Sequence, residues 1–205
     1  MKCKVRGTQL NNEMTREDIY TSIQKMTGIA EGELSFILSR FEERKVKKKM
    51  IILKAGKVAG EVYLVIEGCL RLYYEKDGED LSAYFFTEGM FAGAYDSFTS
   101  RQPSRHAIET IEDSVFLAVS YNEWMALFEE FPRMNEFVRK IIEQRFISLH
   151  QLFTSHILDS PEERYMHLLK YYPNLVNRIP QHQLATFLGV TPVSLSRIRN
   201  RVSKK

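Results

Sequence analysis

The chain has 205 residues, of which 44% are hydrophobic and 27% charged, with a net charge of +3; this allows one or two globular domains with buried cores. Its two cysteines, Cys3 and Cys69, are too few for a disulfide framework or a four-thiolate iron–sulfur cluster. No apolar run approaches the roughly 20 residues that span a bilayer, and the N-terminus lacks a signal-peptide core. The sequence therefore predicts a soluble, cytoplasmic protein.

The first part of the chain is predicted to contain a helical stretch and then a β-rich segment. The helical stretch extends from about residue 16 to 41, and short runs of β-branched and aromatic residues separated by glycines follow it. The predicted strands lie at 50–53, 62–66, 70–74, 81–86, 107–111 and 115–119. Asp77-Gly78 between two of these runs is typical of a hairpin turn. Several short strands at regular spacing favour a small barrel or roll over a parallel sheet.

A basic cluster at residues 44–49 stands at the start of the β-rich segment. A run of this kind is usually a solvated loop and the beginning of a strand. The alternative interpretation is a second site for an anion.

Helices are predicted again after the last strand. Ser120 and Glu123 have the spacing of a capping box. From Pro132, apolar residues recur at intervals of four and three in two stripes. One stripe can cover the β-rich domain and the other needs a partner helix, so we predict a dimerisation helix at residues 132–158. A long core helix in a monomer is the alternative.

The end of the chain is strongly basic. Residues 164–205 contain eight Lys and Arg and no Asp or Glu, a local charge of +8, so residues 1–163 carry −5. A basic end on an acidic body is typical of proteins that bind a polyanion. Nucleic acid is the commonest such partner, because cations placed on phosphates release counterions. A basic surface helix without a partner is the alternative.

Within this basic end, the residues follow the pattern of two short helices joined by a tight turn. Leu184 and Leu188 lie one helical turn apart, and Gly189 follows them where a left-handed cap is required. Thr191 and Pro192 are suited to the N-cap and the first position of a second helix, which ends in arginines. These features predict a helix-turn-helix.

This order of parts resembles the CRP/FNR superfamily of bacterial transcription regulators over about residues 29–202. The most specific similarities are the segments 54–68, 88–93 and 194–199. The resemblance implies an α+β fold with an N-terminal double-stranded β-roll of the cyclic-nucleotide-binding type flanked by helices. A long dimerisation helix and a winged-helix-like helix-turn-helix would follow. The sequence ends seven residues after Ile198, so we expect the wing to be truncated.

The resemblance divides the chain into a sensor domain at 1–131, the dimerisation helix at 132–158 and a DNA-binding domain at 159–205. Recognition helices of a homodimer would enter successive major grooves, and the arginine at position 197 would read a guanine. The residues implied in contact with double-stranded DNA are Gln181, His182, Thr191, Val193, Ser194, Arg197, Arg199 and Arg201. RNA polymerase would be a further partner of such a regulator.

The resemblance also implies an effector pocket, lined by Gly93, Ala94, Tyr95, Ser104, Arg105 and Ser148. Members that bind cyclic AMP carry a Gly-Glu pair where this chain has Gly93-Ala94, so the acceptor for the ribose hydroxyl is missing. Their Arg-Ser or Arg-Thr pair aligns with Ser104-Arg105, and only a loop longer by one residue would place Arg105 on the phosphate. Because an unpaired buried phosphate is costly, we predict that cyclic AMP is not the effector.

The identity of an effector stays open. The pocket could hold another ligand, anionic if Arg105 points inward; it could be filled by Tyr95, Phe98 and His106; or it could bind nothing. No metal or other cofactor is predicted. One of the five histidines could bind a haem, but a lone histidine is far more often a surface or core residue.

No enzyme motif is found. The sequence lacks a Gly-rich phosphate loop, a His-Glu-x-x-His motif and a nucleophile elbow. We therefore predict a transcription regulator, activator or repressor, and not an enzyme. The alternative is a ligand-sensing β-roll that acts through protein contacts and carries a degenerate helix-turn-helix.

Overall fold

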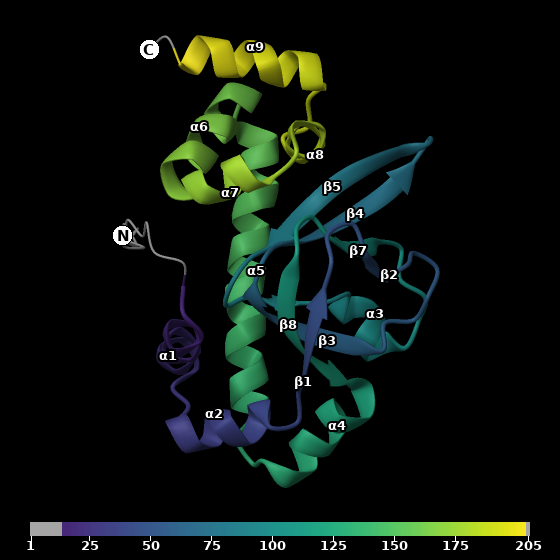
Figure 1. Ribbon diagram of the computed structural model, residues 1–205, viewed down its shortest axis with the longest axis vertical. Helices are drawn as coiled ribbons and strands as arrows, with labels where there is room; N and C mark the ends of the chain where they lie inside the picture. Colours follow the sequence, from purple (N-terminus) through teal and green to yellow (C-terminus); the bar gives the residue numbers. More distant parts are fainter. Residues whose placement is uncertain (1–13, 204–205) are drawn as a thin grey trace.

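A computed structural model describes residues 14–203 (Figure 1), so Cys3 lies outside the described residues. Two helices open the chain, α1 (Arg16–Thr27) and α2 (Glu31–Leu38). Both lie within the predicted helical stretch from about 16 to 41, which is interrupted between Thr27 and Glu31. Gly28 has a φ of 74°, and a residue in this left-handed region ends a right-handed helix.

The β-rich segment forms two four-stranded antiparallel sheets, in the orders β1-β8-β3-β6 and β2-β7-β4-β5. The strands are β1 (Glu42–Val46), β2 (Ile51–Leu53), β3 (Glu61–Glu67), β4 (Leu70–Lys76), β5 (Glu79–Phe86), β6 (Phe91–Ala92), β7 (Ala107–Thr110) and β8 (Ser114–Ser120). Buried side chains of both sheets form one cluster that includes Tyr63, Phe86, Ile108 and Phe116. The predicted β-roll is confirmed.

Two strands and a short helix of this domain have no counterpart in the sequence-based prediction: β1, β6 and α3 (Tyr95–Ser100). Strand β1 lies at a sheet edge and exposes most of its polar side chains, so no apolar alternation marks it. The basic cluster at 44–49 is strand and turn. Arg44 donates to Glu61 Oε1 over 2.7 Å, and Lys47 donates to Asp113 Oδ2 over 2.7 Å.

The β4–β5 hairpin extends away from the body of the molecule (Figure 1). Lys76 pairs with Glu79, and the two residues between them, Asp77 (φ 53°) and Gly78 (φ 81°), are both left-handed. A type I′ turn requires two consecutive left-handed residues, which Asp-Gly supplies at low cost. The predicted hairpin is confirmed.

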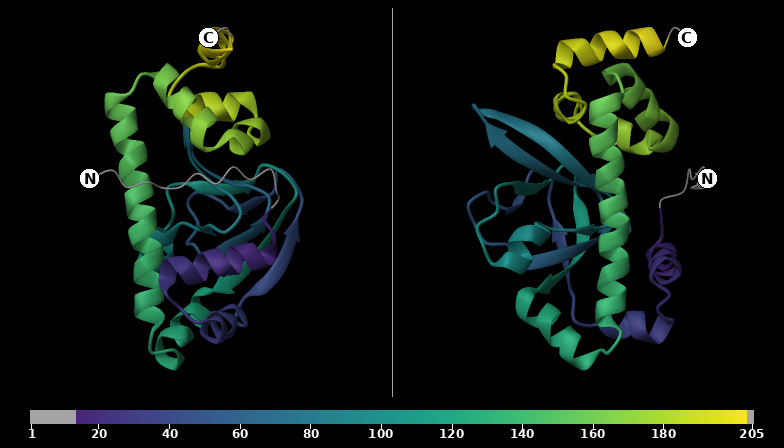
Figure 2. Two further views of the ribbon diagram at one scale, coloured as in Figure 1. Left: turned by 90° about the vertical axis from the view of Figure 1, so that its left-hand side faces the viewer. Right: turned by 180° about the vertical axis from the view of Figure 1, so that it is seen from behind.

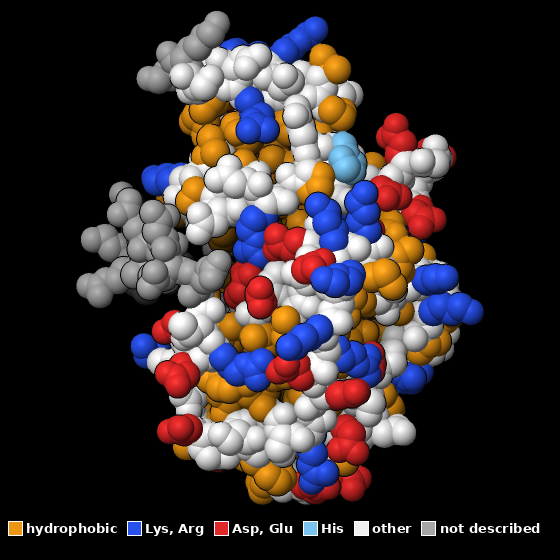
Figure 3. Space-filling model, viewed as in Figure 1, with side chains coloured by type: hydrophobic (Ala, Val, Ile, Leu, Met, Phe, Trp, Pro, Cys, Tyr) orange, Lys and Arg blue, Asp and Glu red, His pale blue; other side chains and the backbone are white. Residues whose placement is uncertain are grey.

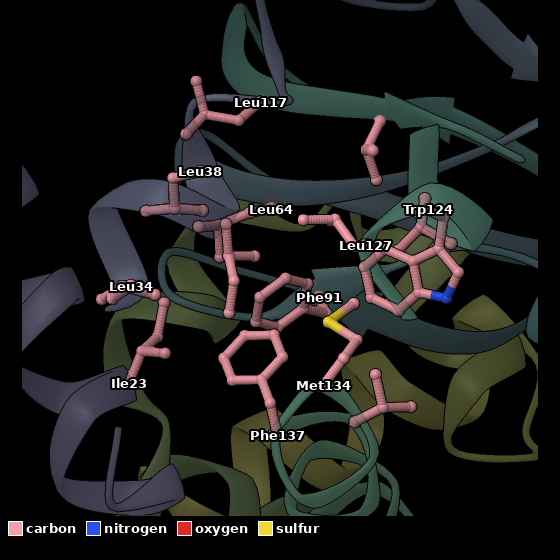
Figure 4. Packing of buried hydrophobic residues seen from close by; sticks show 14 of the residues in the cluster. Ile23, Leu34, Leu38, Leu64, Phe91, Leu117, Trp124, Leu127, Met134 and Phe137 are labelled. Atoms are coloured by element: carbon pink, nitrogen blue, oxygen red, sulfur yellow. The ribbon is translucent and has the colours of Figure 1, made fainter. Parts of the chain in front are cut away.

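A second apolar cluster, here called the lower core, packs the helices against the sheet that contains β3 and β8 (Figure 4). It joins α1 and α2 to α4 (Tyr121–Glu130) and to the first turns of α5 (Met134–Leu158). Phe91 and Phe137 meet in it edge to face, with ring centroids 5.9 Å apart. Ser120 caps α4, since its hydroxyl accepts a hydrogen bond from the Glu123 N–H, which is one of the two bonds of the predicted capping box.

Helix α5 begins at Met134, slightly later than the predicted start at Pro132. Its first turns are buried in the lower core through Met134, Phe137 and Val138. The rest of the helix forms one edge of the molecule, as the left view of Figure 2 shows. We call its exposed apolar row the α5 stripe, formed by Ile142, Phe146, Leu149, Phe153 and Ile157.

Four helices end the described chain and are called the C-terminal unit: α6 (Pro161–Tyr171), α7 (Pro173–Arg178), α8 (Gln181–Phe187) and α9 (Pro192–Val202). Ser160 and Glu163 form the capping box before α6. Helix α7 was not predicted. The apolar cluster of this unit continues into the β-roll, where it includes Cys69, Phe85 and Ile111. No helix within residues 14–203 is long and apolar enough to cross a membrane.

Candidate nucleic-acid interface and effector site

The predicted helix-turn-helix is present as α8 and α9. Gly189 follows α8 with a φ of 69°, so the chain turns there in the left-handed conformation that was expected. The Thr191 hydroxyl accepts a hydrogen bond from the Ser194 N–H over 3.2 Å, and Pro192 opens α9. Leu195 and Ile198 are buried against the rest of the unit. The Thr191 cap and the burial of Leu195 and Ile198 therefore hold α9 against the rest of the unit.

The outer face of α9 carries the side chains best placed to meet a partner. Val193 is 62% exposed, although it is a large apolar residue. Arg197 and Arg199 are exposed and form no ion pair within residues 14–203. Lys and Arg side chains project at the top of the molecule, over α9 (Figure 3). An exposed apolar residue among unpaired arginines is a composition that suits phosphates and base edges.

The other predicted DNA contacts are less open. The Thr191 hydroxyl is used by the cap and also donates to Ser194 Oγ over 3.0 Å. Gln181 Nε2 lies 3.5 Å from the Pro192 carbonyl oxygen, and Arg201 Nε donates to Glu162 Oε2 over 3.0 Å. His182 is exposed on α8.

The six residues predicted to line an effector pocket are spread over two surface hollows and other positions. Ala94 borders a surface hollow of about 610 Å³, together with Lys57 and Tyr63. Ser104 and Arg105 border a separate hollow of about 530 Å³. Other predicted positions lie elsewhere: Gly93 adjoins Val62, Tyr95 packs against the lower core, and the Ser148 hydroxyl on α5 donates to the Gln144 carbonyl.

The loop around α3 is held in place by hydrogen bonds to Ala59 and by a cation–ring contact with Tyr121. Arg101 Nη1 donates to the Ala59 carbonyl over 2.8 Å, and its guanidinium lies 4.1 Å from the centroid of the Tyr121 ring. The Ser97 hydroxyl accepts from the Ala59 N–H over 3.0 Å. Phe98 packs edge to face on Trp124 in the lower core. Of the three side chains suggested as fillers of the roll, Phe98 and Tyr95 therefore belong to the lower core.

His106 is the third of these side chains, and it is buried against the Tyr74 ring at 5.5 Å between centroids. Its Nε2 has no hydrogen-bond partner among the described residues, and burial lowers the pKa of His106 below the usual 6.5, while Asp96 acts in the opposite direction. The unfolded chain therefore binds this proton more readily than the folded chain. His106 contributes stability above the unfolded pKa of 6.5, and that stability is lost as the pH falls toward the lower folded pKa.

We therefore expect the wild-type melting temperature to fall on going from about pH 7 to about pH 5, and to fall less in His106→Phe. Differential scanning fluorimetry across this range measures the difference. His182→Phe, which changes an exposed histidine, serves as the control. An acid-induced drop of the same size in all three proteins would show that His106 is not the source.

A polar network joins the C-terminal unit to the β-roll. Arg178 on α7 donates to both Glu88 oxygens, over 2.7 and 3.0 Å, and to Glu112 over 2.9 Å through Nε. Gln183 Nε2 donates to Glu109 Oε1 over 3.1 Å. Glu109 also lies 2.9 Å from Nε of the buried Arg71, as an ion pair without a well-aligned hydrogen bond.

Sequence reasoning missed three of the arginines that organise these sites: Arg71, Arg145 and Arg178. Each meets residues far away in the sequence; Arg178, for example, meets Glu88 across 90 positions. Arg145 on α5 contacts two rings of β5. No local pattern could have revealed these partners. Within residues 14–203, no group of three or more His, Cys, Asp or Glu side chains is placed to hold a metal ion.

Comparison with known proteins supports this architecture. Residues 43–131 match the family described as the cyclic nucleotide-binding domain. No curated protein matches the chain. Among solved structures, the fold is similar to that of the c-di-GMP-responsive global regulator CLP of Xanthomonas campestris. That similarity has a TM-score of 0.69 and 18% identity, and covers 85% of this chain and 92% of CLP.

Two further structures give the same picture. FixK2 of Bradyrhizobium japonicum aligns with a TM-score of 0.70 at 17% identity, over 80% of this chain and 85% of its own. A CRP/FNR-family regulator of Eubacterium rectale aligns with a TM-score of 0.66 at 17% identity, over 86% and 84%. At 17–18% sequence identity, the similarity to these three structures establishes that the fold is shared.

Proposed function

We propose that this chain, which contains a cyclic nucleotide-binding domain and has the fold of the CRP/FNR regulators, is a homodimeric transcription regulator that binds specific DNA sequences. The observation that carries the proposal is the outer face of α9. Arg197, one turn after Val193, stands there without an acidic partner within residues 14–203, in a segment of the sequence that contains no Asp or Glu. The bidentate guanidinium of Arg197 suits the O6 and N7 atoms of a guanine in the major groove.

The α5 stripe supports the homodimer. It begins where α5 leaves the lower core, and its two phenylalanines, Phe146 and Phe153, are 69% and 64% exposed. Its members are spaced at four, three, four and four residues, as in a seam between two helices. A second copy of α5 would bury this row. Two-fold pairing would then present two α9 helices to one duplex.

The proposal includes that this dimer does not bind cyclic AMP as an effector. Ala94 offers no acceptor for a ribose hydroxyl, and Arg105 lies at a hollow apart from Ala94. The boundaries 1–131, 132–158 and 159–205 stay part of the proposal, as does a contact with RNA polymerase. The same holds for a cytoplasmic location.

The test begins with selection of genomic fragments by the purified protein at near-physiological salt. We expect an enriched two-fold site with half-sites about one helical turn apart. On that site, Arg197→Ala should lose about 1–3 kcal/mol of discrimination at one base position, measured by fluorescence anisotropy with all four bases there.

Lys170→Ala is the matched control, since it removes one positive charge from the same unit on α6. It should leave base discrimination unchanged and weaken binding evenly at most. If no site is enriched, or if Arg197→Ala and Lys170→Ala discriminate the four bases on an enriched site equally well, DNA reading through Arg197 is refuted. The β-roll would then act through protein contacts.

A further inference from the structure

Arg145 occupies an unusual position between α5 and the β-roll. Its guanidinium carbon lies 4.5 Å from the centroid of the Tyr84 ring and 4.6 Å from that of the Phe86 ring. The two rings are neighbours on β5, 5.1 Å apart and inclined at 53°, so they form an aromatic corner. Nη2 also donates to the Phe91 carbonyl over 2.6 Å. One planar cation thus ties α5 to both β5 and β6.

The charge of Arg145 is not neutralised by a carboxylate within residues 14–203. Glu143, the nearest acid along the helix, pairs with Arg139 and Lys140. Burial lowers the pKa of Arg145, because the charged form loses water, while Tyr84 acts in the opposite direction. A cation in this setting is held by ring faces and a carbonyl oxygen, which are the partners that suit a planar guanidinium and suit an ammonium poorly.

Arg145 lies next to the part of α5 that is proposed to form the dimer. It immediately precedes Phe146, the most exposed phenylalanine of the α5 stripe. The preceding turns of α5 are fixed by the lower core, whereas the stripe belongs to none of the apolar clusters within residues 14–203. The direction in which α5 presents its stripe is therefore set at Arg145. Neither of the two hollows described above is lined by Arg145, Tyr84 or Phe86.

We propose that Arg145 fixes the dimerisation helix against the β-roll without any small molecule: its guanidinium fills the aromatic corner formed by Tyr84 and Phe86 and is bonded to the Phe91 carbonyl. This inference rests on the proposed homodimeric function. It makes Arg145 a positioning residue, which acts on DNA binding through α5. The DNA-binding competence of the dimer would then be constitutive.

The test removes the guanidinium and supplies it again from solution. Arg145→Ala should weaken dimerisation about tenfold, the value of one or two cation–ring contacts, and should weaken binding to the selected DNA site. Methylguanidinium, small enough to enter the space left, should restore both at millimolar concentration. Methylammonium at the same ionic strength should not. Sedimentation velocity measures the dimer and fluorescence anisotropy measures the DNA.

Three controls make the outcome decisive. Arg139→Ala removes an exposed arginine from the same helix and should behave as wild type. Arg145→Lys keeps the charge without the plane and should stay impaired. Arg145→Met keeps the apolar stem, so it separates loss of the cation from loss of packing if the alanine variant fails to fold.

Each possible result either supports or overturns the proposed role of Arg145. Weakened dimers that methylguanidinium restores support the proposal. Unchanged dimers in Arg145→Ala and Arg145→Met overturn it, as does full function in Arg145→Lys or a defect that methylguanidinium leaves in place. If the wild type forms the dimer but binds no DNA, the proposed function fails while the sedimentation arm still decides the role of Arg145.

Discussion

Replacing Phe146 and Phe153 together by Glu should convert the protein from a dimer to a folded monomer. Both rings are mostly exposed in one chain, at 69% and 64%, and lie seven residues apart on one face of α5. A two-fold dimer would bury four such rings. At about 1.5–3 kcal/mol for each, their loss removes on the order of 6 kcal/mol or more of association free energy. The introduced carboxylates would repel each other across the seam as well.

Sedimentation velocity should show the monomer at micromolar protein, and binding to a two-fold DNA site should be lost with it. The matched control is Gln144→Glu with Gln151→Glu. These two exposed residues have the same seven-residue spacing on the opposite face of α5, so the added charge is equal. A double-Glu variant of the stripe that remains dimeric would show that α5 is not the seam. Far-UV circular dichroism should remain close to wild type in both.

The second large effect is expected from Arg178→Ala, which should loosen the C-terminal unit from the β-roll. Arg178 forms ion pairs with both Glu88 and Glu112, and the three side chains are between 20% and 29% exposed. Its removal leaves two carboxylates facing each other without a cation. Fully buried pairs cost about 3–5 kcal/mol when broken in this way, and partial exposure reduces the expected loss here to about 2–3 kcal/mol.

Hydrogen exchange of the α8 amides and the melting temperature would measure this loss. Arg139→Ala, which breaks an exposed pair on α5, should cost only a few tenths of a kcal/mol. Adding Glu88→Gln and Glu112→Gln to Arg178→Ala should recover part of the stability, because no unpaired charge then remains. Equal melting temperatures for Arg178→Ala and Arg139→Ala would mean that the network does not hold the unit in place.

The features predicted correctly from the sequence are those that neighbouring residues decide. The Asp77-Gly78 turn and the cap at Thr191 need only a few adjacent residues with the right backbone preferences. The helix break at Gly28 is also decided by neighbouring residues, although it was not predicted from the sequence. Strand β1 was not predicted, because it is little buried and most of its side chains are polar. Its place comes from pairing with β8.

The contacts of the candidate sites could not be predicted, because they join distant parts of the chain. Ser104 and Arg105 are adjacent to each other, yet they reach a different hollow from Ala94. Arg145 shows the limit most clearly. From the sequence it is one of several charged residues on α5, and only the folded roll brings Tyr84 and Phe86 beneath it. Charge and periodicity describe a helix face but do not identify its partner.

The continuous cluster between the β-roll and the C-terminal unit restricts how this chain can be recombined with its relatives. Cys69, Phe85 and Ile111 belong to one buried cluster with Leu184 and Leu188. In a chimera that places residues 159–205 on another scaffold, the apolar side chains of this segment that belong to the shared cluster would be exposed to water. In the β-roll left behind, Cys69, Phe85 and Ile111 would also face water. Exchange of the helix-turn-helix as a cassette therefore requires the facing β-roll residues to be exchanged with it.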